Sequence, residues 1–179
     1  SGRSGSGKST LANALIDLGL GFVSDDSVKV EIKDGSPYAT GSYPLRKLCS
    51  DTVDWYAKNP ENMIEINDGG RQKFALKMKE DTQKKNKFKN LVILEASDCE
   101  SVNIREVKGT QKINYLIECL YKKDSYYEMG FSSRILKTCL LIAAGLEMYV
   151  IERPKNKMTV MEQIQCLKNK GLVFGEISL

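Results

Sequence analysis

The 179-residue sequence contains no histidine. This absence excludes histidine-based catalytic triads, histidine metal sites and phosphohistidine chemistry within the chain. Any general base must therefore be a carboxylate, a lysine, a tyrosine or a cysteine.

Closely spaced cysteines and long apolar runs are missing as well. An odd number of cysteines without a C-x-x-C pair favours reduced, structural thiols over a disulfide framework or a zinc site. No run of about 18 apolar residues occurs, and the N-terminus lacks a charged-then-apolar signal segment. We therefore expect a cytoplasmic protein with no membrane partner. The cysteines are Cys49, Cys99, Cys119, Cys139 and Cys166.

A strong excess of charge of one sign is also lacking, since the formal net charge is +4. The densest basic stretch, residues 77–89, is typical of a solvated loop or helix end. We expect no nucleic-acid partner, and the sequence leaves open whether the chain forms a homo-oligomer.

The length and the apolar content of 41% fit one domain over residues 1–179. Apolar spacing predicts helices and strands in alternation, with a turn at Asp34-Gly35, another at residues 68–70, and an irregular segment at 43–47. The result is a mixed α/β domain. Helices are expected at 8–18, 50–58, 111–121, 131–144 and 160–168, and strands at 21–24, 28–32, 36–40, 91–95, 102–107 and 148–151.

The opening residues carry the strongest motif. Gly2, Gly7, Lys8 and Ser9 satisfy the spacing G-x-x-x-x-G-K-S of a phosphate-binding P-loop, and the predicted helix begins where that motif requires it. Glycines let successive N–H groups face an anion, and the helix dipole adds favourable potential. The predicted nucleotide-binding residues are Gly2, Arg3, Ser4, Gly5, Ser6, Gly7, Lys8, Ser9 and Thr10.

Within this loop Lys8 is expected to bridge the β- and γ-phosphates of ATP, and the Ser9 hydroxyl to bind Mg²⁺. A buried strand normally precedes such a loop, yet only Ser1 stands before Gly2. We therefore expect that strand to come from residues outside this chain.

A second set of functional groups is expected at Asp25-Asp26, which follow the predicted helix and strand. Two adjacent carboxylates repel unless one binds a metal, which leaves the other with a raised pKa and suited to accept a hydroxyl proton. Glu95, at the end of an apolar strand, is the rival metal-binding or water-activating residue because it resembles a Walker B acid. An exposed acidic turn is the alternative interpretation of Asp25-Asp26.

Cations that could clamp a transferred phosphate are candidates in the turn-rich segments. Arg46 and Arg71 are the two that we assign to the catalytic set, beside Lys8 and Asp25. Surface charge is the alternative interpretation of each arginine.

The run Gly-x-Ser-Gly-Ser-Gly-Lys-Ser-Thr-Leu-Ala, with Phe22-Val23-Ser24-Asp25-Asp26 after the first helix, resembles the catalytic domain of the HPr kinase/phosphorylase family and its shorter relatives. The later order of strands and helices is loosely similar. The resemblance implies a P-loop-containing, phosphoenolpyruvate carboxykinase-like mixed sheet with flanking helices. It also implies an ATP-dependent kinase with Asp25 as base and Asp26 on Mg²⁺, although the order within the pair stays open.

The sequence has no histidine to assist the base and no glycine-rich segment like that of the full bacterial enzyme. This favours an acceptor other than HPr, a hydroxyl of a peptide, protein or small molecule. Two alternatives remain: a small-metabolite P-loop kinase, and an ATP-binding regulatory module without turnover. A transporter ATPase is disfavoured because its signature segment and switch histidine are absent.

Overall fold

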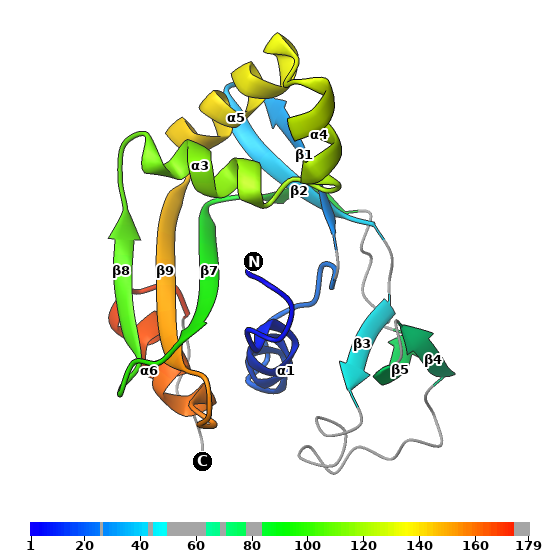
Figure 1. Cartoon of the computed structure of the whole chain (residues 1–179), viewed down its shortest axis with the longest axis vertical. Helices are drawn as coiled ribbons and strands as arrows, with labels where there is room; N and C mark the ends of the chain where they lie inside the picture. The colour runs from blue at the N-terminus through cyan, green and yellow to red at the C-terminus, as the bar shows by residue number, and fades with distance from the viewer. Residues whose placement is uncertain (26, 43–44, 50–63, 69–70, 78–83, 174–179) are drawn as a thin grey trace.

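A three-stranded sheet holds the N-terminal loop in place in the computed structural model (Figure 1). Its order is β7 (Asn90–Ser97), β9 (Glu147–Pro154) and β8 (Asn103–Val107), with β9 parallel to β7 and antiparallel to β8. Ser1 and Gly2 lie along the other side of β7. Gly2 forms a parallel bridge with Leu94, and the Leu94 N–H donates to the Ser1 carbonyl at 2.8 Å.

The structure describes residues 1–25, 27–42, 45–49, 64–68, 71–77 and 84–173. Within these ranges, no helix is long and apolar enough to cross a membrane. Cys99, Cys119, Cys139 and Cys166 are free thiols, and of these four only Cys139 is buried.

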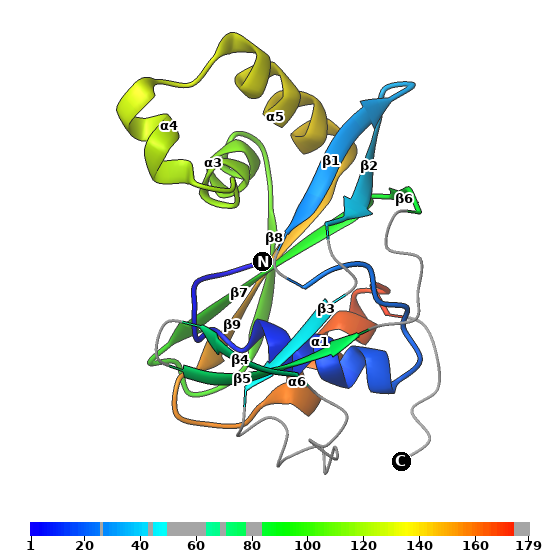
Figure 2. The ribbon, with the colours of Figure 1, turned by 90° about the vertical axis from the view of Figure 1, so that its right-hand side faces the viewer.

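Successive residues of the sheet face two different cores, because side chains alternate along a strand. Ile93 and Val150 belong to the core formed with α3 (Gln111–Glu118) and α5 (Ser133–Gly145). Leu94 and Ile151 belong to the core formed with α1 (Lys8–Asp17) and α6 (Val160–Asn169). Figure 2 shows α3, α4 (Lys123–Met129) and α5 in its upper part and α1 and α6 in its lower part.

A β-hairpin covers α5. Strands β1 (Val28–Lys33) and β2 (Ser36–Gly41) pair in antiparallel register, and β6 (Asn86–Lys87) adds to β2. Positive φ at Asp34 and Gly35, 50° and 73°, is the geometry of the tight hairpin turn that Asp-Gly favours. Pro37 meets the end of α5 so closely that a Cβ on Gly145 would lie 2.8 Å from its Cδ.

A third sheet is made of β3 (Leu45–Cys49), β5 (Arg71–Lys77) and β4 (Ile64–Asp68), in the order β3-β5-β4 with antiparallel pairing. It includes part of the segment 43–47, so the expectation of irregular structure was wrong for residues 45–47. The sequence Tyr43-Pro44 favours a turn, which led to the expectation of irregular structure. The strand that follows is defined by its pairing with β5, which a local sequence pattern does not specify.

The structure confirms the mixed α/β class. It also confirms every predicted helix and strand that falls on described residues, except the strand at 21–24. Residues 21–24 form no strand, because the place beside β7 is taken by Ser1 and Gly2, and Phe22 is buried without pairing. Helix α4 and strands β4 and β5 were not anticipated. The helix expected at 50–58 lies outside the described residues, and the carboxykinase-like arrangement stays a prediction.

Candidate phosphate-binding loop

The backbone of residues 2–7 bends at its glycines. Gly2, Gly5 and Gly7 have φ angles of 143°, 78° and 94°, which L side chains rarely adopt. A Cβ on Gly2 would lie 2.3 Å from the Leu94 carbonyl oxygen. The close approach to β7 and the strained bends therefore require glycine, as the P-loop interpretation predicts.

The loop ends at the N-terminus of α1, which is not capped by a side chain. Gly7 occupies the N-cap position without a side-chain hydrogen bond, and the first turn contains no acidic residue. A helix start carries N–H groups without intrahelical acceptors and a partial positive charge. With Lys8 as the first helical residue, this end of α1 favours an anion.

The Lys8 ammonium folds back onto the loop. Its Nζ donates to the Arg3 carbonyl at 2.7 Å, and the same carbonyl accepts from the Ser6 N–H at 3.2 Å. These two hydrogen bonds hold the Lys8 ammonium at the loop, and its contact with phosphate stays a prediction.

The Ser6 hydroxyl is the most informative buried group of the loop. Ser6 is 3% exposed, and among the described residues its Oγ has no hydrogen-bond partner. Burying a hydroxyl without a partner costs about 1–3 kcal/mol. A phosphate oxygen in the loop could satisfy this donor, so the residues present fit an anionic ligand.

A residue that the sequence interpretation missed supports the loop from the end of β9. Arg153 donates from Nε to the Ser6 carbonyl at 2.8 Å and from Nη2 to the Gly5 carbonyl at 3.3 Å. Its Nη1 donates to the Pro154 carbonyl at 2.8 Å. The one available signal was a charged residue at the end of an apolar strand.

The remaining predicted loop residues lie around this frame. Arg3 and Ser4 are exposed, and Ser9 and Thr10 are half-buried in the first turn of α1. The role of Ser9 as a Mg²⁺ ligand stays a prediction, and Asp26 lies outside the described residues. In the described part of the chain, no cluster of three or more His, Cys, Asp or Glu side chains could hold a metal ion.

The end of α3 borders the loop. Cys119 Sγ donates to Ser1 Oγ at 3.1 Å. Hydrogen bonds from Lys123 and Tyr127 lower the pKa of the Glu118 carboxyl, and the charge of Arg3 contributes to the same shift. An acidic group is thus kept ionised on the α3 side of the loop.

Asp25 lies on the segment that joins α1 to β1 and is half-buried. Its neighbours tie this segment to the end of the hairpin: Ser24 Oγ accepts from the Ser42 N–H at 3.3 Å, and Ser27 Oγ donates to Ser42 Oγ at 3.0 Å. The strand expected to lead into Asp25 is absent, so its role as base stays a prediction.

Glu95, the rival acid, is engaged on the α3 side of the sheet. Its Oε1 accepts from the Tyr115 hydroxyl at 3.3 Å, and its Oε2 lies 4.0 Å from Arg105 Nη2. Arg105 also donates to the Tyr115 hydroxyl at 2.8 Å. These contacts give Glu95 a structural explanation that does not involve a ligand.

The two candidate arginines are not brought together by the strands that carry them. Arg46 pairs with Leu76 near the end of β5, whereas Arg71 begins β5 and pairs with Asp68. Five residues of a strand span about 17 Å. Their backbone positions therefore do not support one shared phosphate clamp.

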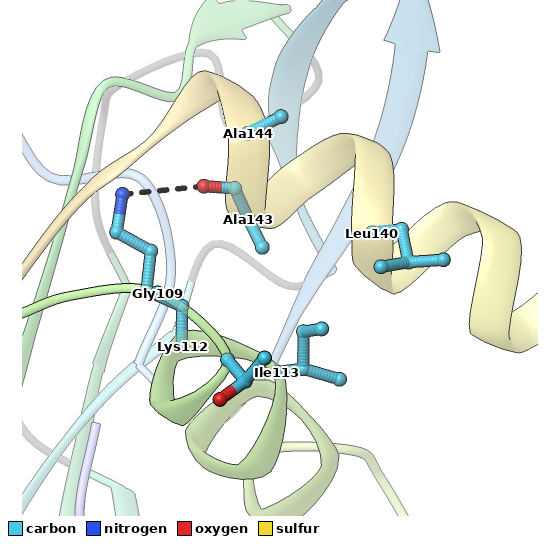
Figure 3. A pocket seen from close by; sticks show the side chains of 7 residues that line it. Gly109, Lys112, Ile113, Leu140, Ala143 and Ala144 are labelled. Atoms are coloured by element: carbon cyan, nitrogen blue, oxygen red, sulfur yellow. Dashed lines mark hydrogen bonds between the residues drawn. The ribbon is translucent and has the colours of Figure 1, made fainter.

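A hollow of about 380 Å³ lies between α3 and α5, away from the loop (Figure 3). Lys112 reaches from α3 to the C-terminal end of α5, where its Nζ donates to the carbonyls of Ala143 and Leu146. A lysine suits the negative end of a helix. We assign this contact to packing rather than to the candidate site.

Comparison with known proteins found no matching family model, no matching curated protein and no matching solved structure.

Proposed function

We propose that the chain binds ATP through the loop 2–10 and transfers its γ-phosphate to a hydroxyl group, in a manner similar to HPr serine kinases. The observation that carries the proposal is the loop itself: strained glycines lead from the bridge between Gly2 and β7 into an uncapped helix N-terminus, and the Lys8 ammonium is hydrogen-bonded to the loop. Each of these features favours a phosphate chain over a neutral ligand.

In this proposal Lys8 and the N–H groups of the loop hold the β- and γ-phosphates. Ser9, with Asp26, would hold Mg²⁺, which when bound neutralises charge on the phosphates. The acceptor hydroxyl oxygen forms a bond to the γ-phosphorus, and the bond from this phosphorus to the β–γ bridging oxygen breaks. ADP leaves, and Asp25 accepts the hydroxyl proton.

The acceptor is a hydroxyl of a peptide, a protein or a small molecule. A transfer assay with γ-labelled ATP and a panel of hydroxyl acceptors, including serine peptides and sugars, separates these classes. Transfer of the label to an acceptor by the wild-type chain supports a kinase, whereas hydrolysis without transfer shows turnover of ATP but no acceptor. Tight binding without either one would replace the kinase with an ATP-binding regulatory module.

Asp25→Asn tests the assignment of the base. Losing a general base costs on the order of 10²–10⁴ in rate, so turnover should fall within that range while the Kd for MgATP changes little. The matched control is Asp34→Asn in the exposed hairpin turn, where asparagine tolerates the positive φ. Equal turnover in the Asp25 variant and the wild type would remove Asp25 from the mechanism.

A further inference from the structure

Arg153 connects the main sheet to the candidate loop. It lies in β9 next to Pro154, yet it donates to two successive loop carbonyls, those of Gly5 and Ser6, which are 148 and 147 residues away in the sequence. The same guanidinium also donates to the Pro154 carbonyl. Three main-chain oxygens from two separate segments are thus held by one side chain.

The consequence for the loop follows from peptide geometry. A peptide group whose carbonyl is held on one side presents its N–H on the other, so the bond to the Ser6 carbonyl directs the Gly7 N–H away from Arg153. The bond to the Gly5 carbonyl fixes the peptide whose N–H, that of Ser6, donates to the Arg3 carbonyl and closes the turn of the loop. Only the planar, forked guanidinium can hold two neighbouring carbonyls in fixed directions, because a lysine ammonium is a single point on a flexible stem.

Gly7 allows the guanidinium to lie this close. A Cβ at position 7 would lie 3.2 Å from Arg153 Nε and 3.3 Å from Nη2. Arg153 therefore packs against the N-cap residue of α1 and also holds the two residues before it.

We propose that Arg153 is a positioning residue that holds the loop in its phosphate-binding conformation before the nucleotide arrives. The inference rests on the proposed function for its ligand, but the loop conformation can be tested without any ligand. A site that is formed in advance saves the free energy of ordering the loop on binding. Arg153 acts through the loop backbone and does not touch the phosphates.

The experiment compares Arg153→Met, Arg153→Lys and Lys155→Met. Lys155 is the matched control because it is a cation two residues further on, paired with Asp98 at 3.0 Å. The first readout is the rate of trypsin cleavage after Arg3 in the ligand-free protein. This peptide carbonyl is held by Lys8 and Ser6 in the formed loop, and cleavage requires local opening.

We expect cleavage after Arg3 to accelerate in Arg153→Met by on the order of 10-fold, with wild-type rates in Lys155→Met. The second readout is the Kd for MgATP. It should rise on the order of 10- to 100-fold in Arg153→Met, the scale of a hydrogen bond to a charged group. Arg153→Lys should lie between Arg153→Met and the wild type in both readouts, because lysine keeps the positive charge but lacks the paired N–H donors of the guanidinium.

Wild-type cleavage and wild-type affinity in a folded Arg153→Met variant would overturn the proposal. Equal effects in Lys155→Met would also overturn it, because they would show that charge alone matters. If Arg153→Met fails to fold, the same comparison is made with Arg153→Lys, for which unchanged values contradict the proposal. If the wild type binds no MgATP, the proposed function fails, while the cleavage rates still decide whether Arg153 positions the loop.

Discussion

Helices α1 and α5 begin in different ways. At α5, Ser132 is extended and its Oγ accepts from the Ile135 N–H at 3.3 Å, so the helix start is satisfied by its own sequence. At α1, Gly7 provides no side-chain cap, and the loop before it is held from outside by Arg153. One helix start is thus capped by its own side chain, whereas the other has N–H groups that, in the proposed function, bind an external anion.

The largest effect is expected from the cation that distinguishes α1. Lys8→Ala removes the ammonium over the loop, and the Kd for MgATP should rise roughly 100-fold, since a hydrogen bond to a charged group contributes up to about 3 kcal/mol. Isothermal titration checks this. Lys108→Ala is the control, because Lys108 is 77% exposed and pairs only with Glu106 among the described residues. Equal affinity in the two variants would contradict the assignment of Lys8.

A smaller effect is expected from the backbone of the same helix. In Gly7→Ala, the left-handed φ costs about 1–2 kcal/mol, and the added Cβ presses on Arg153. The Kd for MgATP should rise about 10-fold, as measured by titration. Gly19→Ala is matched to it, because Gly19 follows the same helix with a φ of 90° and open space around it.

Both glycine variants should lose similar thermal stability, because the backbone strain is alike, but only Gly7→Ala should lose affinity. A parallel loss of affinity in Gly19→Ala would show that strain anywhere on α1 weakens binding. The special geometry of the loop would then not be the cause.

The smallest effect is expected at α5. Ser132→Ala removes the cap and should lower the free energy of unfolding by about 1 kcal/mol, measured by urea denaturation. The Kd for MgATP should stay at the wild-type value, because this helix start takes no part in the proposed site. A changed Kd would remove the contrast between the two helices.

The start of α1 combines residues that were predictable from the sequence with one that was not. The loop was predictable because Gly2, Gly7 and Lys8 act within ten residues, and short-range spacing decides both the turn and the helix that follows. Arg153 was not predictable, since its contact with the loop depends on the register of β9 beside β7. Nothing in the residues around Arg153 encodes that register.

The wrong predictions also concern contacts between strands that the local sequence does not encode. Apolar residues near Phe22 predicted a strand, but a strand exists only where a neighbouring strand has a free edge, and Ser1 and Gly2 take that place. The strand β3 was missed because it is stabilised by pairing with β5, and the local sequence does not reveal that this neighbouring strand is present. Arg46 and Arg71 were grouped by residue type alone, and the register of β3 and β5 separates them.

Nucleotide binding by the loop is tested by titrating the isotope-labelled chain with MgATP and following the backbone amide chemical shifts. If the loop binds the nucleotide, the largest shifts occur at residues 2–10, with smaller ones at Arg153. Shifts confined to the hollow between α3 and α5, or no shifts at saturating MgATP, would contradict it.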